Sequence, residues 1–286
     1  MKILVLGASG MLGASLVPHL TACGHQVASH GRRGEWAADL GNAGETLMLL
    51  RRVSPEAVIN LVGLTDVDRC ESHPKEAWLT NVLTAENAAT ASAAVGAHLI
   101  QISTDQVYDQ APSNNESQAC PGNHYAMSKY AGELAALGAG ATVLRSNFFG
   151  LSRHPTRRSL TDWLFNALTK GQPLQVFDDV RFSPLSMATL CEMIEAVALR
   201  RQHGIFNLGS CGGMSKADFA FTFAGTLGLA TTTMSRGLAA NATFLKAWRP
   251  KAMCMDSHRF EQVFGQTLPD LEAEIERAAK DYRELH

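Results

Sequence analysis

The sequence predicts an α/β protein with a doubly wound parallel sheet and a smaller C-terminal α/β lobe. Two observations carry this prediction. Up to Gly150, short apolar runs alternate with helix-forming segments, which is the rhythm of parallel strands joined by helices. Beyond it, the segments become shorter and more mixed in character. We therefore expect a sheet domain over residues 1–150 and mainly a second lobe over 151–286, with about 188–208 returning to the sheet domain.

The composition argues against nucleic acid and anionic membranes as partners. The 286 residues are 46% hydrophobic and 18% charged, with a formal net charge of -2. This balance gives no electrostatic footprint for nucleic acid or for an anionic membrane.

No segment approaches the ~20 apolar residues of a membrane span, and the first apolar run is too short for a signal peptide. The 6 cysteines are scattered without the spacing of zinc ligands. We expect a cytoplasmic protein with reduced thiols and no metal site.

The N-terminal segment has the pattern of a phosphate-binding turn. A continuous apolar run, Ile3–Leu6, leads into a glycine-rich turn, and a helix-compatible stretch follows to about Cys23. In this arrangement backbone N–H groups and the positive end of the helix face an anion, and glycines let the anion approach. A plain turn is the alternative. As in a Rossmann domain, we expect a dinucleotide cofactor to contact Gly7, Ser9, Gly10, Met11, Leu12 and Gly13.

The end of the second strand indicates which cofactor binds. That strand is expected at Gln26–His30, and Arg32 and Arg33 follow it without an acidic residue. An acid there binds the ribose hydroxyls of NAD, whereas arginine accommodates the 2′-phosphate of NADP. NADPH is therefore favoured, with NAD possible, and solvated loop charges are the alternative for the two arginines. Asp39 and Leu40, further along this loop, are candidate contacts for the adenine.

A third buried strand is expected at Ala57–Gly63. It is apolar enough to be covered on both faces. Its last residues, Val62 and Gly63, are expected to lie against the cofactor, because a glycine lets the backbone come close. Thr65, just beyond them, is a candidate for substrate binding.

The next strand and the helix after it carry the candidate catalytic residues. Leu99–Ile102 is expected as a buried strand whose end presents Ser103 to the cofactor and Thr104 to the substrate. In the following helix, Tyr125 and Lys129 stand four apart and share a face. An ammonium close to a phenol lowers the Tyr pKa, which makes the Tyr a usable proton donor near neutral pH. A surface Tyr on an amphipathic helix is the alternative.

Two alanine-rich segments predict helices beside the sheet. Pro74–Val95 is expected as one long helix, and its Asn81 is a candidate to hold a water or a backbone turn near Lys129 and the cofactor. An exposed Asn is the alternative. Tyr125–Leu137 is the second helix. The two helices could pair across the two-fold axis of a homodimer, although alanine-rich faces also pack within one chain.

The remaining segments complete the sheet and build the second lobe. Another core strand is expected at Thr142–Arg145. The others are expected as helices or short strands at Leu160–Lys170, Pro173–Phe177, Leu190–Arg200, Ile205–Leu208, Lys216–Leu229 and Leu268–Leu285.

Several motifs occur in the order typical of one enzyme family. They are Gly7-x-x-Gly10-x-x-Gly13, Asn60 with Gly63, Asn81-Val82, Ile102-Ser103-Thr104-Asp105, Tyr125-x-x-x-Lys129-x-x-Gly132-Glu133, Leu144-Arg145, Asp178-Asp179, Ser183-Pro184 and Arg249-Pro250. Over essentially its whole length the chain resembles the extended short-chain dehydrogenase/reductases, and most closely the dTDP-4-dehydrorhamnose reductase group. The resemblance implies that Tyr125 protonates a sugar ketone oxygen, that Lys129 binds the nicotinamide ribose, and that Thr104 positions the carbonyl.

Two departures from related enzymes bear on the reaction. Sugar nucleotide 4,6-dehydratases, which are similar in general plan, carry an Asp-Glu pair after the threonine that does the proton work of eliminating water. Here the pair is Asp105-Gln106, and a glutamine cannot serve as that acid or base, so elimination is disfavoured. The family reductases commonly have a tryptophan in the stretch where this chain has Ser146-Asn147-Phe148-Phe149-Gly150. Phe148 is a candidate for the aromatic wall, with ordinary packing as the alternative.

Arginines are candidates for the pyrophosphate of a nucleotide-linked substrate, since their planar fork matches phosphate. They occur in the basic loop Arg153–Arg158 and at Arg181 and Arg249. A solvated surface is an equally good interpretation for the loop. The candidate substrate-binding residues are Thr65, Thr104, Asp105, Gln106, Asn147, Phe148, Arg181 and Arg249.

The resemblance implies an NADPH-dependent reductase of a nucleotide-linked 4-keto-6-deoxy sugar, acting in polysaccharide biosynthesis. Two alternatives stay open. One is a nucleotide-sugar epimerase that keeps NAD tightly bound. The other is a non-catalytic, NADP-binding regulatory subunit that serves to bind another enzyme. The absence of an acid after the second strand argues against the epimerase, and the intact Thr104, Tyr125 and Lys129 count against the regulatory subunit.

Overall fold

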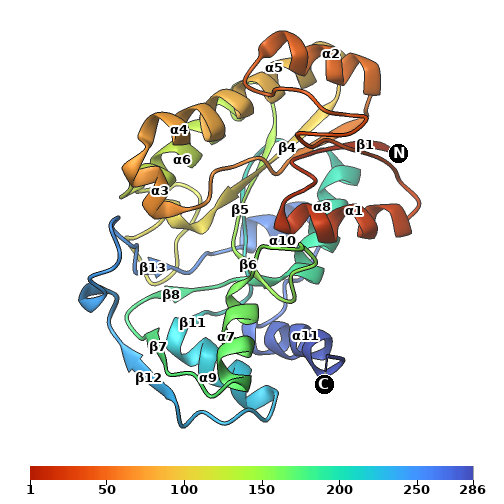
Figure 1. Cartoon of the computed structure of the whole chain (residues 1–286). Helices are drawn as coiled ribbons and strands as arrows, with labels where there is room; N and C mark the ends of the chain where they lie inside the picture. Colours follow the sequence, from red (N-terminus) through yellow and green to blue (C-terminus); the bar gives the residue numbers. More distant parts are fainter. Residues whose placement is uncertain (286) are drawn as a thin grey trace.

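The protein is built on a six-stranded parallel sheet with helices on both faces (Figure 1). The computed structural model describes residues 1–285. The strand order is β10-β5-β4-β3-β1-β2. The strands are β1 Lys2–Leu6, β2 Gln26–Ser29, β3 Ala57–Asn60, β4 His98–Thr104, β5 Thr142–Ser146 and β10 Gly204–Leu208. The predicted doubly wound α/β fold is therefore confirmed.

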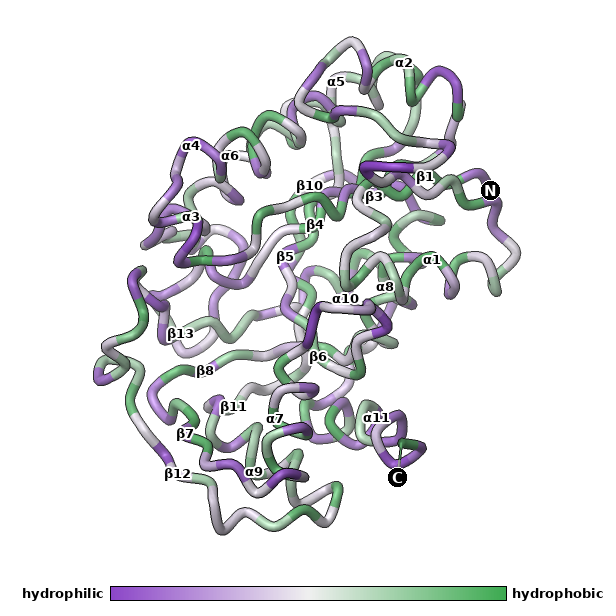
Figure 2. Tube along the Cα trace, viewed as in Figure 1, coloured by the Kyte–Doolittle hydropathy of each residue, from purple (hydrophilic) through white to green (hydrophobic). Residues whose placement is uncertain are grey.

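The apolar strands bury both of their faces. In β1, Ile3 and Val5 join one hydrophobic core, whereas Leu4 and Leu6 join the core on the opposite face. Successive residues of a strand point to opposite faces, so a continuous apolar run needs a cover on both. Figure 2 shows the hydrophobic residues along these central strands. One face is covered by α1 (Met11–Ala22), α8 (Met187–Arg200) and α10 (His258–Phe264), the other by α2 (Ala43–Val53), α5 (Thr84–Val95) and α6 (His124–Gly138).

The order of the strands creates a binding crevice. From β1 the chain moves outward to β2, then crosses back to β3 on the other side of β1. The connections on the two sides of this point run in opposite directions, which leaves a crevice outside the carboxyl ends of the strands. Gly7 and Gly63, which follow β1 and β3, lie at this point.

The predicted helix Pro74–Val95 forms as a continuous helical stretch with a widened turn. It consists of α4 (Pro74–Trp78), the π-helical η1 (Leu79–Leu83) and α5, and the short helix α3 (Val67–Ser72) precedes it. The π turn contains Asn81, whose carbonyl oxygen faces Gly132 of α6. A β-carbon at residue 132 would lie 2.4 Å from that oxygen, so a glycine there allows close packing of α6. Local π turns often occur at functional sites.

The C-terminal residues form a separate hydrophobic core beside the sheet. Phe219 and Tyr282 belong to it and are buried. Its helices are α7 Leu160–Thr169, α9 Lys216–Thr226 and α11 Leu271–Arg283. Short strands and 3-10 turns complete the chain: β6 Phe148–Phe149, β7 Leu174–Phe177, β8 Arg181–Phe182, β9 Leu185–Ser186, β11 Met214–Ser215, β12 Met234–Gly237, β13 Ala252–Met253, η2 Asp105–Val107 and η3 Ala239–Asn241.

The segment 188–208 lies with the sheet rather than with this C-terminal core. Helix α8 packs on α1, and β10 pairs in parallel with β5 at the sheet edge. The division into a cofactor domain and a substrate lobe at residue 150 stays a prediction. Within residues 1–285, no helix has the length and apolar character that a membrane crossing needs.

Candidate functional site

A cleft of about 720 Å³ opens at the carboxyl ends of the sheet strands. It brings together the glycine turn after β1, the end of β4, the first turns of α6 and the residues after β5. The predicted site residues that line it are Gly10, Met11, Leu12, Gly13, Gly63, Thr65, Ser103, Thr104, Asp105, Gln106, Tyr125, Lys129, Asn147 and Phe148.

The glycine turn is tightly folded. Gly7 has φ of +77°, a left-handed conformation that favours glycine, and a β-carbon there would lie 3.1 Å from the backbone N of Val62. At Gly13 a β-carbon would lie 2.3 Å from the carbonyl oxygen of Ala8. Helix α1 begins at Met11 after Gly10, so no side chain caps its first N–H groups. These groups are therefore free to bind an anion from the cleft.

His30, which the sequence analysis did not assign to the site, holds this turn from β2. Its Nδ1 accepts a hydrogen bond from the Gly7 N–H at 3.3 Å, and its Nε2 lies 3.1 Å from the carbonyl oxygen of Ala38. An accepting Nδ1 places the ring proton on Nε2, which donates to Ala38. Burial lowers the pKa of His30, so the ring is neutral at pH 7. The ring therefore joins the turn to the loop at Ala38 through hydrogen bonds and adds no positive charge.

The three candidate catalytic residues lie together in the cleft. Thr104 ends β4, and Tyr125 and Lys129 occupy one face of α6. Tyr125 is 6% exposed, and its hydroxyl lies beside that of Thr104. The two oxygens can therefore approach the same oxygen of a substrate.

The electrostatics of Tyr125 differ from the sequence-based expectation. Burial raises its pKa, the charge of Asp105 adds to that rise, and the Thr104 hydrogen bond opposes it. Lys129 is turned toward β4, where its Nζ donates to the carbonyl oxygen of Ile102 at 2.7 Å. Burial lowers the pKa of Lys129 to about 8, against an opposing effect of Glu133. Helical spacing predicted the shared face, but it could not reveal that burial raises the pKa of Tyr125 or that the Lys129 ammonium turns toward β4.

Asn81 links the loop after β3 to helix α6 beside the cleft. Its Oδ1 accepts the Leu64 N–H at 2.7 Å, and its Nδ2 donates to the Leu64 carbonyl oxygen and to Ser128 Oγ at 3.2 and 2.9 Å. The side chain is therefore committed to the loop after β3 and to α6. Asn81 holds a backbone turn near Lys129, and a contact with the cofactor stays a prediction.

The residues after Thr104 form the opposite end of the cleft. Asn147 Nδ2 donates to Asp105 Oδ2 at 2.7 Å. Burial raises the pKa of Asp105 to about 6, and the Asn147 hydrogen bond and the charge of Lys216 oppose the rise. Gln106 Oε1 is buried and has no hydrogen-bond partner within residues 1–285. Such an atom is costly to leave unsatisfied, so a ligand hydroxyl would be a favourable partner.

The candidate arginines separate into two groups. Arg157 and Arg158 of the basic loop line the cleft. Arg249 instead forms an ion pair with Asp68 at 2.9 Å, and Arg181 donates to the Gly213 carbonyl oxygen at 2.8 Å. Their guanidinium groups already have partners in the chain.

The other predicted cofactor contacts lie outside the lining of the cleft. Arg32 and Arg33 are exposed in the loop after β2. That loop adjoins the turn, because a β-carbon at Gly31 would lie 3.7 Å from Ser9 Oγ. Leu40 is 5% exposed and packs in the core. Asp39 Oδ1 accepts the Gly41 N–H at 2.9 Å, so its side chain supports its own loop.

The cleft has further lining residues that the sequence did not point to: Leu61, Leu64, Asp66, Arg69, Ile102 and Ser146. Of these, Arg69 pairs with Glu76 at 2.6 Å. The segment after Gly63 carried no motif, so only its position after a sheet strand could have pointed to it.

A buried ionic network lies beneath the catalytic strand. The side chains of Arg145 on β5 and Glu133 on α6 are fully buried, with Arg145 Nη2 2.7 Å from Glu133 Oε2. Ser103 Oγ donates to Glu133. On the other side, Arg145 Nη1 donates to the Tyr108 hydroxyl at 2.7 Å, and that hydroxyl donates to Asn207 Oδ1 at 2.6 Å. The network therefore links β4, β5, β10 and α6.

Comparison with known proteins agrees with this architecture. The family model described as the RmlD substrate binding domain matches residues 1–284. The chain is 27% identical to a probable low-salt glycan biosynthesis reductase, Agl14, of Haloferax volcanii, over 99% of each chain. It is 25% identical to the dTDP-4-dehydrorhamnose reductase of Escherichia coli, over 97% of this chain and 96% of that protein.

A solved structure of similar fold is the dTDP-4-dehydrorhamnose reductase of Bacillus anthracis in complex with NADP. It has a TM-score of 0.89 at 23% identity and covers 98% of this chain and 99% of that one. The resemblance inferred from the motifs is therefore confirmed, and the relatives are named as reductases. The chain belongs to the RmlD substrate binding domain family, a family of oxidoreductases.

Proposed function

We propose that the protein is an NADPH-dependent reductase of a nucleotide-linked 4-keto-6-deoxy sugar. The observation that carries this proposal is the convergence of Thr104, Tyr125 and Lys129 in one cleft with the glycine turn. The named relatives support the substrate class. The overall reaction joins a ketone, a hydride from NADPH and one proton to give an alcohol and NADP⁺.

The residues of the cleft fit a dinucleotide. The tight turn between β1 and α1 presents free N–H groups for the pyrophosphate. Gly63 keeps the opposite wall open, since a β-carbon there would lie 3.3 Å from Asn81 Oδ1 and 3.7 Å from Lys129 Nζ. The bound cofactor would supply the hydride. Lys129 would donate to the ribose hydroxyls of the nicotinamide half.

Each catalytic residue has a defined task at the ketone. Tyr125 would donate its hydroxyl proton to the ketone oxygen as that oxygen gains negative charge. Thr104 would donate a hydrogen bond to the same oxygen and hold it in place. Burial of Tyr125 favours its protonated form, which is the form that a reductase needs at the start of each turnover.

The substrate would bind at the end of the cleft formed by Asp105, Gln106 and Asn147. The unsatisfied Gln106 Oε1 supports a contact with a sugar hydroxyl. Arg157 and Arg158 line the cleft and would bind the substrate pyrophosphate. The expected cytoplasmic location and the homodimer remain part of this proposal.

The test is NADPH oxidation with dTDP-4-dehydrorhamnose as the acceptor. We expect absorbance of the reduced nicotinamide to fall and an alcohol product to form in equal amount, with no NAD carried through purification. Bound NAD and interconversion of two sugars without net oxidation would instead identify an epimerase. A protein that binds NADPH but turns over none of a panel of nucleotide-linked keto-sugars would support the regulatory role.

The arginines after β2 are expected to set the preference for NADPH. Replacing Arg32 and Arg33 together with serine should raise the KM for NADPH about tenfold to a hundredfold, the effect of losing charge-assisted hydrogen bonds to a phosphate. The KM for NADH should change little, because NADH lacks that phosphate. Arg51→Ser, an exposed charge on the neighbouring α2, is the control. Equal losses with both cofactors would contradict the assignment.

The pH profile of kcat/KM is expected to be bell-shaped. Lys129 is protonated below its pKa of about 8, so activity should fall as pH rises through that value and the ammonium is lost. Asp105 gains a proton below its pKa of about 6, so activity should also fall as pH drops through it. Asp105→Asn should remove the acid limb, and Lys129→Arg should move the alkaline limb upward. If neither variant changed its limb of the pH profile, the acid and alkaline limbs would belong to groups other than Asp105 and Lys129.

A further inference from the structure

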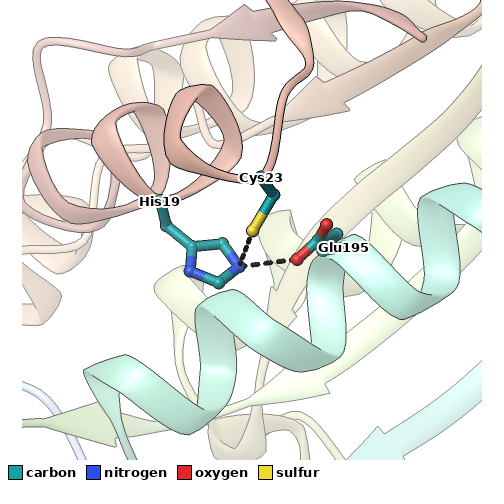
Figure 3. A group of neighbouring side chains, drawn as sticks. All are labelled: His19, Cys23 and Glu195. Carbon is teal, nitrogen blue, oxygen red and sulfur yellow. Dashed lines mark hydrogen bonds and ion pairs between the residues drawn. The ribbon is translucent and has the colours of Figure 1, made fainter.

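A second group of chemically reactive side chains lies outside the cleft, where the end of α1 meets α8 (Figure 3). His19 lies on the last turn of α1, Cys23 caps the end of that helix four residues later, and Glu195 reaches them from α8. The donor atoms of these three residues lie within 4.8 Å of one another. His19 Nε2 is 2.8 Å from Glu195 Oε2 and 3.8 Å from Cys23 Sγ.

A second imidazole completes the group. His25, two residues beyond Cys23, places its Nε2 3.0 Å from the other carboxylate oxygen of Glu195. His25 and Glu195 are largely buried, with side-chain exposures of 8% and 19%, whereas Cys23 is exposed. The group therefore has a fixed inner part and one ligand that solvent can reach.

The donor set matches the preferences of zinc. Zinc in proteins takes cysteine sulfur, histidine nitrogen and carboxylate oxygen in a tetrahedron with bonds of about 2.0–2.3 Å. Donor atoms around such an ion are about 3.3–3.7 Å apart. Among His19, Cys23 and Glu195, the separations of 2.8 and 3.8 Å lie near those values. His25, 3.0 Å from the other oxygen of Glu195, would turn toward the ion to become the fourth ligand.

We propose that His19, Cys23, His25 and Glu195 form a zinc site. Binding would replace the thiol proton of Cys23 by the metal and would release that proton to solvent, because a thiolate is the ligand. Glu195 comes from a helix far away in the sequence, so the ion would tie α1 to α8. The spacing of cysteines alone did not reveal the site, since only one cysteine takes part.

Zinc binding is measured on protein without a histidine tag, after removal of metal with a chelator and dialysis. Competition with a chromophoric chelator should give one zinc ion per chain. Substitution with Co²⁺ should give the visible bands of a tetrahedral site and a near-ultraviolet band from thiolate coordination. Cys23→Ser should abolish the thiolate band and weaken zinc binding at least about tenfold. Cys211→Ser, a second exposed cysteine, is the matched control.

His25→Ala provides an independent test, because it removes a ligand without touching the exposed thiol. We expect His25→Ala to weaken zinc binding by a similar factor. Added zinc should raise the Tm of the wild-type protein more than that of the His25→Ala variant. Circular dichroism of each metal-free variant confirms that it is folded. Zinc binding that is absent, or that survives both Cys23→Ser and His25→Ala, would overturn the proposal. Neither outcome depends on reductase activity.

Discussion

Replacing Tyr125 with phenylalanine is expected to lower kcat for ketone reduction about 10²–10⁴-fold, the usual contribution of a positioned proton donor. The substitution removes only the hydroxyl that lies beside Thr104. The buried ring can stay in place, so the affinity for NADPH and the Tm should change little. Steady-state NADPH oxidation and a separate titration of NADPH by fluorescence measure the two effects.

Tyr130→Phe is the matched control. Tyr130 lies on the same helix, one residue after Lys129, and its ring stacks near Arg145 rather than in the cleft. It should retain turnover within a few-fold. If Tyr125→Phe kept the turnover of this control, another group would be the proton donor and the proposed mechanism would be wrong.

Glu133→Gln is expected to lower the free energy of unfolding by about 3–5 kcal/mol. The substitution keeps the shape of the side chain but leaves the guanidinium of Arg145 as an uncompensated charge in the interior, where both side chains are fully buried. The loss of stability comes from that buried charge more than from the lost attraction. Urea unfolding, followed by circular dichroism, gives the free energy.

The same substitution at an exposed ion pair shows how much of the loss of stability comes from burial of the unpaired charge. Glu276 and Arg283 on α11 are 2.8 Å apart, and their side chains are about half exposed. Glu276→Gln should leave the free energy of unfolding nearly unchanged, because solvent screens an exposed ion pair. The double variant Glu133→Leu with Arg145→Met should recover part of the loss, because it removes both charges. Equal effects of Glu133→Gln and Glu276→Gln would contradict this account.

Local patterns in the sequence were sufficient for the sheet and for the centre of the site. The apolar runs at Ile3–Leu6 and Ala57–Gly63 predicted strands β1 and β3. A strand that is buried on both faces needs apolar residues at every position, so a continuous run indicates such a strand. The spacing of Tyr125 and Lys129 predicted their shared face, since helical geometry depends only on neighbours in the chain.

Contacts between residues far apart in the sequence could not be predicted from local patterns. Leu40 was expected near the cofactor but packs in the core, because burial depends on α2 and α5 closing over that loop. Arg249 is already paired with Asp68, and no local pattern links residues so far apart. The basic loop Arg153–Arg158 was a candidate for the pyrophosphate, and Arg157 and Arg158 line the cleft, but composition alone could not choose between the cleft and a solvated surface.

The buried network around Arg145 also has a consequence for how the chain folds. Arg145 binds Glu133 on α6 and the Tyr108 hydroxyl directly, and successive residues of β5 point to opposite sides of the sheet. A slip of β5 by one position would turn the guanidinium toward the apolar layer under α1 and α8, away from Glu133. That misaligned chain would carry two isolated charges in its interior. The buried ion pair therefore disfavours strand alignments in which Arg145 and Glu133 lie on opposite faces of the sheet.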